Sequence, residues 1–297
     1  METEYQNLRN LTIANQDIDI SWINLECIWH GMLSEDIKKQ VGVMFSQGVC
    51  EMQKGKKINL YVEANGFKRF IELSADAVLK NNTLLNLYEE KTMEITKQMR
   101  NYAYELLDRV ETLSKEEILE ILPKIKKMQA ESMTYGCVVV FADVHGAITN
   151  KISDILRSRG SLKYPTHIYP AVLSFEKTLT QKAYEEITSS NESDEDLLKK
   201  YFWLDQGYIG RGLTKERLLE IRKQPKELEE LPSKQELLDE LKLSQEEARF
   251  FEVSKKLILI KSLRGDSRQF LNVIVSRIMD KLAKELDIEV ELIETLY

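Results

Sequence analysis

The sequence predicts a mainly α-helical protein: a multi-helix domain with one small β-hairpin around residues 58–73. Only 12 Gly and 5 Pro occur among 297 residues, and this scarcity of chain breakers favours helices over sheets with many turns. Hydrophobic residues make up 43% and charged residues 31% of the chain, as in an ordinary globular protein. The length allows one large core or two modest ones.

Helical signals begin near the N-terminus. The apolar residues spread over 18–33 are compatible with a helix that Asp17 or Asp19 caps. Ser34 is followed by two acidic residues, which are favourable at the positive end of the helix dipole, so a second helix is expected from there to about Glu51.

The clearest strand signal is the segment INLYVEANGFKRFIEL, residues 58–73. Two runs of alternating, aromatic and β-branched residues flank Asn65 and Gly66, a pair that readily adopts the backbone conformation of a type I′ turn. We therefore expect a β-hairpin here, packed by one face on helices because an isolated hairpin is only marginally stable.

The rest of the chain is expected to be helical. Capping boxes at Ser114 and Ser244 mark two helix starts. Pro123 interrupts the helical pattern after the first or marks a new start, and Gly265 is a possible break after the second. The β-branched run Val138 to Val140 leaves a strand open as an alternative. The expected helices cover Ser74 to Tyr88, 89–110, a stretch from Ser114, 130–158, about 180–187, a stretch from Thr214, and 244–286.

An acidic segment divides the chain into two expected regions. Residues 189–196 read SSNESDED and contain almost no apolar side chain, so we expect an exposed connection there. An N-terminal helical region with the hairpin, 1–188, precedes it, and a C-terminal helical region, 197–297, follows it.

Charge and cysteine content exclude several classes. The net charge of −7 argues against broad nucleic-acid binding. The three cysteines, Cys27, Cys50 and Cys137, show no CxxC spacing, which indicates free thiols and a cytoplasmic protein. The polar start METEYQNLRN resembles no signal peptide, and no apolar run approaches the roughly 20 residues of a membrane span.

No complete catalytic apparatus is visible, so whether the chain is an enzyme stays open at this point. His30, His145 and His167 have no partner at a metal-ligand spacing, which predicts no metal site. GxGxxG, GxxxxGK[ST] and GxSxG patterns are all missing, and no nucleophile lies beside a base. We therefore predict no catalytic residue and no cofactor.

One basic stretch stands out in the acidic chain. Residues Lys255 to Lys284 contain eight Lys or Arg and two acidic residues. Lys261, Arg264 and Arg268 are spaced i, i+3, i+7, which places them on one helical face that could bind a phosphate group or a partner. The alternative is a solvated basic face, or an ion-pair partner of the acidic segment 227–247.

The C-terminal third resembles a known family. It contains the turn Tyr201-Phe-Trp-Leu204, the pair Leu213-Thr214, Arg264 with Arg268, and a terminal stretch from Leu286 to Tyr297. This order is similar to the central helical region of phosphoenolpyruvate-utilising enzymes of the phosphoenolpyruvate synthase type. The earlier segment FIELSADAVLKNNTLLNLYEEKTMEITKQM resembles the entry into that region, so the resemblance covers most of the chain with soft motifs.

The resemblance implies a role without catalysis by this chain alone. Members of the family join an ATP-grasp domain and a phosphohistidine domain through a helical linker, and this sequence contains neither domain and stops where the phosphohistidine domain would begin. The expected function is a helical linker or docking module of such a phosphotransferase, as a split or truncated product acting with separately encoded ATP-grasp and phosphohistidine domains. One alternative is a non-catalytic scaffold that binds another protein through Trp203 and Tyr208, and a second is a small-molecule-binding helical domain.

Overall fold

A computed structural model gives the fold of most of the chain. It describes residues 11–19, 22–42, 48–52, 57–159, 177–204, 212–223, 239, 241–290 and 293.

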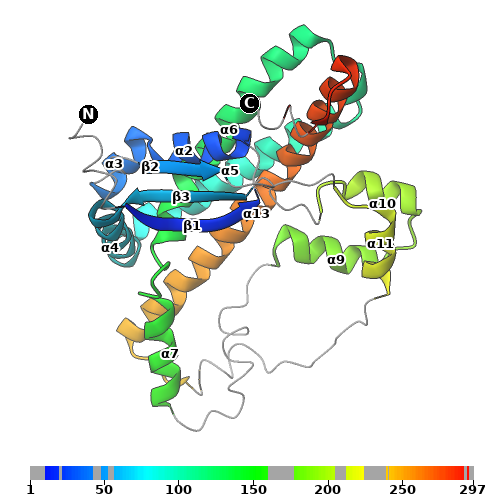
Figure 1. Cartoon of the computed structure of the whole chain (residues 1–297). Coiled ribbons are helices and arrows are strands. Elements are labelled where there is room, and N and C mark those ends of the chain that lie inside the picture. The colour runs from blue at the N-terminus through cyan, green and yellow to red at the C-terminus, as the bar shows by residue number, and fades with distance from the viewer. Residues whose placement is uncertain are drawn as a thin grey trace, which may run out of the picture.

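The protein is mainly helical, as the sequence predicts (Figure 1). A 42-residue helix, α13, runs diagonally through the molecule and at 1.5 Å per residue is roughly 60 Å long. The α-helices of the described residues are α2 (Trp22–Met32), α3 (Glu35–Val41), α4 (Ala64–Lys80), α5 (Asn82–Leu107), α6 (Lys115–Phe141), α7 (Thr149–Ser158), α9 (Leu179–Ser189), α10 (Asp194–Lys200), α11 (Lys215–Arg222) and α13 (Gln245–Leu286).

The predicted hairpin at 58–73 is wrong, because only its first half is extended. The strand β3 (Lys57–Glu63) leads directly into α4, and Asn65 and Gly66 lie in the first turn of that helix. The Glu63 carboxylate caps the helix by accepting hydrogen bonds from the backbone N–H groups of Asn65 and Gly66, at 2.9 and 2.5 Å. The helical spacing of the buried side chains from Phe67 to Val78 prevails over the β-like alternation of the first residues.

Strand β3 pairs elsewhere. It lies between β1 (Leu11–Asp19) and β2 (Gly48–Met52) in the order β1-β3-β2, antiparallel to both. Leu60 is opposite Cys50 of β2, and Ile58 is opposite Ile18 of β1. The partners of β3 therefore precede it in the sequence.

Several helix boundaries also differ from the expectation. Ser74 lies buried inside α4, Pro123 lies inside α6, and Gly265 lies inside an unbroken α13. Val138 to Val140 are helical and fully or largely buried at the end of α6, and a turn at 142–148 separates this helix from α7. The capping boxes at Ser114 and Ser244 are both confirmed.

Two buried clusters share the long helices. The first contains side chains such as Met99, Ile125, Trp203 and Ile274, and draws on α5, α6, α9 to α11 and the C-terminal half of α13. The second draws on α3, α4, the end of α6, α7 and the N-terminal half of α13. Each cluster takes residues from both sides of the acidic segment 189–196. This segment contains the last residue of α9, the loop 190–193 and the first turn of α10.

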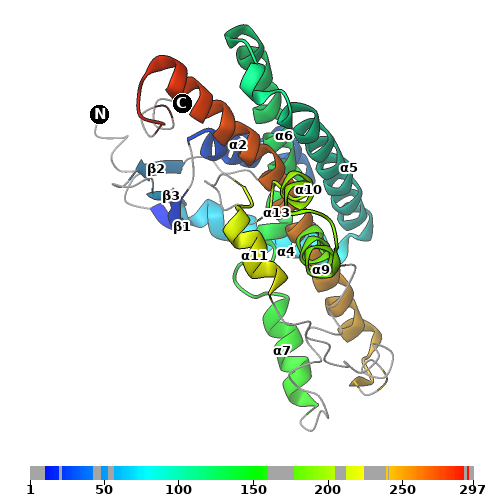
Figure 2. The same cartoon turned by 90° about the vertical axis from the view of Figure 1, so that its right-hand side faces the viewer.

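Close helix packing surrounds α6 (Figure 2). Gly31 of α2 lies so near to α6 that a Cβ atom at this position would be 2.3 Å from the Met133 Cβ and 2.6 Å from the Ala130 carbonyl oxygen. The Thr134 hydroxyl donates to the Gly31 carbonyl oxygen at 3.3 Å across the same contact. A residue without a side chain is therefore required at the crossing of these two helices.

We predict that Gly31→Ala lowers the free energy of unfolding by about 1–3 kcal/mol, because backbone and Cβ atoms of α6 must move apart. Gly265→Ala is the matched control: it is also a helical glycine, but nothing lies within 4 Å of its added Cβ. That variant should gain up to ~1 kcal/mol from the better helix propensity of alanine. Urea unfolding followed by circular dichroism measures both, and equal stabilities would contradict the close crossing.

Candidate functional site

The predicted basic row lies on one face of α13, and this face is turned toward α6 and α2. The Arg264 side chain packs over Gly136 of α6, where a Cβ atom would be 2.2 Å from its Cδ, and its Nη1 is 3.1 Å from the Met133 sulfur. Arg268 is only 4% exposed. Burial raises the pKa of the Cys27 thiol of α2, and the positive charge of the nearby Arg268 acts against this rise.

Lys261 completes the row toward the end of α6. Burial lowers the pKa of this lysine, and the nearby Arg264 lowers it further, whereas the Asp143 carboxylate acts in the opposite direction. Lys261 and Arg264 are half-buried and Arg268 is buried, so the row is not a solvated face. The acidic segment named as the alternative partner lies mostly outside the described residues.

The row belongs to a polar seam between α6 and α13. Gln129 donates from Nε2 to the Asn272 Oδ1 at 2.9 Å, and the Ser132 and Ser267 hydroxyl oxygens lie 3.5 Å apart. All four residues are buried. Because the α6 numbers rise while the α13 numbers fall, the two helices are antiparallel, and polar contacts fix their alignment.

Asp143 organises the turn that follows α6. Its Oδ1 accepts hydrogen bonds from the backbone N–H groups of Ile148 and Thr149, at 2.7 and 3.0 Å, and its Oδ2 accepts from the Thr149 hydroxyl. The carboxylate thereby caps the start of α7 and stays close to Lys261. In the sequence, the signal for this role is no more than an acidic residue a few positions before a helix.

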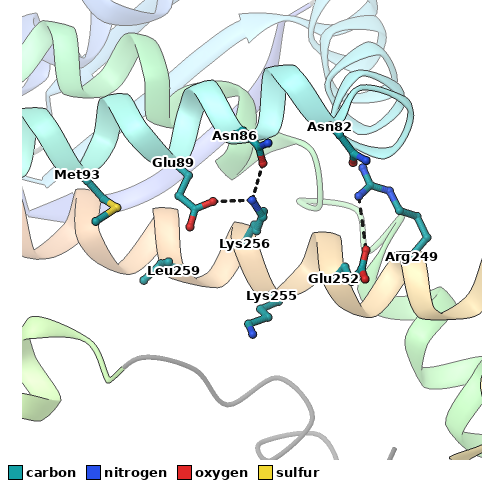
Figure 3. Close-up of a pocket in the computed structure, with 9 residues that line it drawn as sticks. All are labelled: Asn82, Asn86, Glu89, Met93, Arg249, Glu252, Lys255, Lys256 and Leu259. Atoms are coloured by element: carbon teal, nitrogen blue, oxygen red, sulfur yellow. Dashed lines mark hydrogen bonds and ion pairs between the residues drawn. The ribbon is translucent and has the colours of Figure 1, made fainter.

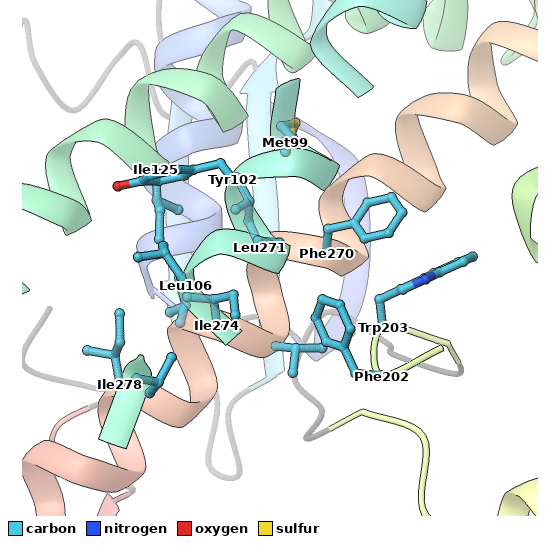
Figure 4. Packing of buried hydrophobic residues seen from close by; sticks show 14 of the residues in the cluster. Met99, Tyr102, Leu106, Ile125, Phe202, Trp203, Phe270, Leu271, Ile274 and Ile278 are labelled. Carbon is cyan, nitrogen blue, oxygen red and sulfur yellow. The ribbon is translucent and has the colours of Figure 1, made fainter. Parts of the chain in front are cut away.

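The aromatic turn 201–204 is a packing element. Trp203 is 4% and Phe202 2% exposed, and their rings lie 4.7 and 6.5 Å from that of Phe270 of α13 (Figure 4). Leu213 donates its N–H to the Phe202 carbonyl oxygen at 3.1 Å, and Gly212 supplies the φ of +97° that this close return requires. The Trp203 ring is therefore part of the buried core. Tyr208 lies outside the described residues.

A buried carboxylate in the middle of α13 caps the start of α9. Asp266 is 5% exposed, and it accepts hydrogen bonds from the Leu179 N–H at 3.1 Å and from the Thr180 hydroxyl at 2.6 Å. Burial raises the pKa of Asp266, and the hydrogen bonds from the start of α9 oppose this rise. Sequence reasoning missed this long-range helix cap, which joins residues 86 positions apart.

A cleft of about 550 Å³ lies between α5 and α13 (Figure 3). The Lys256 ammonium group is 2.6 Å from a Glu89 carboxylate oxygen and 2.5 Å from the Asn86 Oδ1, and Arg249 lies 3.9 Å from Glu252. Met93 forms an exposed apolar edge. Among the described residues, the charges that line the cleft are largely paired with one another, which favours a structural role for these side chains over acid–base or nucleophilic chemistry.

The two histidines that the structure describes are both exposed. His30 is exposed, with its Nε2 3.5 Å from Glu26, His145 is exposed, and His167 lies outside the described residues. Within the described ranges, no three His, Cys, Asp or Glu side chains are grouped to hold a metal ion. The helices of the same ranges include none with the length and apolar character of a membrane span.

Comparisons with known proteins return no matching family, no matching curated protein and no matching solved structure. The arrangement of the residues is therefore the basis for the functional inference below, together with the sequence resemblance.

We predict that Arg268→Ala lowers the free energy of unfolding by about 2–3 kcal/mol, because a buried, packed side chain is removed from the seam. Lys97→Ala, an exposed position on α5, is the control and should change stability by less than about 0.5 kcal/mol. Denaturant unfolding measures both. A stability of Arg268→Ala equal to that of the control would show that the seam does not depend on this residue.

We also predict that Cys27 and Cys137 resist thiol reagents in the folded chain. Burial raises the pKa of the Cys27 thiol to about 12, so about one in ten thousand is ionised at pH 8, and burial likewise raises the pKa of Cys137. In a Cys50→Ser background, labelling with a chromogenic disulfide should be slow in buffer and fast in denaturant, and the rate in buffer should still be rising above pH 9. Rapid labelling at pH 8 without denaturant would contradict the burial of these thiols.

Proposed function

We propose that this chain is a helical docking module of a phosphotransfer system of the phosphoenolpyruvate synthase type. It carries no catalytic group of its own in this proposal. It holds separately encoded ATP-grasp and phosphohistidine domains in a productive arrangement. It speeds phosphoryl transfer by positioning these domains.

The main support is the role that the resembling residues have in the fold. These residues come from separate places in the sequence, yet each one either packs in the protein interior or caps a helix. They are the turn at Tyr201 to Leu204, the pair Leu213-Thr214, and Arg268. Thr214 accepts a hydrogen bond from the Arg217 N–H at the start of α11, and the turn packs on α13. A resemblance carried by packing residues favours a shared framework over shared chemistry.

The shape of α13 supports the same proposal. A helix of 42 residues that contributes to two cores is a stiff element along which two domains can be held apart at a fixed distance. In this proposal Lys261, Arg264 and Arg268 stabilise the α6–α13 pair. Partner domains then bind exposed surface elsewhere.

The scaffold alternative based on the aromatic turn has less support. Trp203 is buried against Phe270, so its side chain cannot be a contact residue unless the turn comes away from α13. We therefore propose the docking module as the function.

The proposal predicts that the same organism encodes separate ATP-grasp and phosphohistidine proteins, and the test uses such a pair. With labelled ATP or phosphoenolpyruvate alone, the purified chain should acquire no acid-labile phosphate. Added to both partner proteins, it should form a complex in size-exclusion chromatography and speed labelling of the phosphohistidine protein by about tenfold or more, the order of gain that tethering gives. The same partner mixture without the chain is the control.

Two results would contradict the proposal. One is stoichiometric label on His30, His145 or His167 of the isolated chain, since it would then carry the phosphoryl group itself. The other is the lack of both a complex and a rate increase with partner proteins that are active in their own assays.

A further inference from the structure

A second pocket lies where α5, α10, α11 and α13 meet, beside the aromatic turn. This open pocket has a volume of about 360 Å³, within the usual range for small-molecule sites. Leu107 of α5, Leu198 of α10, Phe202 of the turn and Leu213 form its apolar part. Figure 1 shows α10 and α11 lying together on one side of the molecule. The lining residues come from helices that are far apart in the sequence.

The charged part of the pocket is strongly positive. Among the described residues, the charged groups that line it are the side chains of Lys199 of α10, Lys215 of α11 and Arg277 of α13 and the carboxylate of Asp108. These described lining residues, three cations and one anion, sum to a charge of +2 in a chain whose net charge is −7. This excess is opposite in sign to the protein as a whole, so it favours an anionic ligand at this place.

The cations differ in how they are held. The Lys199 ammonium group is 2.9 Å from the Asp108 carboxylate and is thereby neutralised. Within the described part of the chain, the side chains of Lys215 and Arg277 have no ion-pair or hydrogen-bond partner. Arg277 is half-buried on the rigid α13, and Lys215 is the first residue of α11, where the helix dipole adds positive potential.

We propose that this pocket binds a phosphate monoester with a small apolar or aromatic organic group. The Arg277 guanidinium pairs with two phosphate oxygens, the Lys215 ammonium with a third, and the organic group contacts Leu198 and Leu213 at the apolar wall. The site is separate from the basic row at Lys261, Arg264 and Arg268, and it does not require the partner domains of the proposed function.

Binding of phenyl phosphate to the purified full-length chain tests this assignment by isothermal titration calorimetry, with inorganic phosphate and benzoate as comparison probes. We expect phenyl phosphate to bind most tightly, because it alone supplies both a dianion and an apolar ring. Its Kd should rise with salt, since paired charges are screened. Lys215→Ala combined with Arg277→Ala should raise the Kd at least tenfold.

The control is Lys97→Ala combined with Lys182→Ala, which removes two exposed lysines that do not line the pocket and should leave the Kd unchanged. Circular dichroism checks folding, and Lys215→Glu, an exposed position, replaces the double variant if Arg277→Ala does not fold. The proposal is overturned if phenyl phosphate does not bind, if the pocket variants bind it as well as the control does, or if inorganic phosphate or benzoate binds equally well. These outcomes are independent of whether the chain forms a complex with partner domains.

Discussion

The antiparallel packing of α13 on α6 is the contact on which the rest of the structure depends. Both helices contribute to both hydrophobic cores, so a shift of one along the other would disturb each core at the same time. Hydrophobic contacts alone specify such an alignment weakly. Two polar pairs specify this alignment, Gln129 with Asn272 and Ser132 with Ser267. A shift by one helical turn would leave their buried polar atoms without partners.

The same interface explains the unusual charge pattern of the C-terminal helix. Arg268 and Asp266 lie two residues apart on α13, are both buried, and point to different neighbours. Asp266 caps α9, whereas Arg268 lies toward α2 and the Cys27 thiol. Burial of each charge is costly unless it is compensated, so these positions bind neighbouring elements to α13 more selectively than apolar residues would.

The proposed ligand site and the helix packing use different cations in this protein. The row at Lys261, Arg264 and Arg268 has the spacing of an anion-binding face, yet it lies at a helix interface. Lys215 and Arg277 belong to different helices, which come together only in the folded chain. No spacing pattern along one helix therefore links these two residues. A ligand is selected by groups that converge in space, and spacing along one helix does not report such convergence.

The sequence by itself determined the helical character of the chain and the helix starts at Ser114, Thr214 and Ser244, because these signals are local and each cap lies within three residues of its donor. Tertiary structure decided that residues 64–73 are helical, because the apolar face of this helix is buried against the rest of the protein. The alternating pattern of the same residues has no such packing. It also decided which face of α13 is buried. Side-chain type restricts what a residue can do, but the neighbour that it meets is set by packing between segments more than a hundred positions apart.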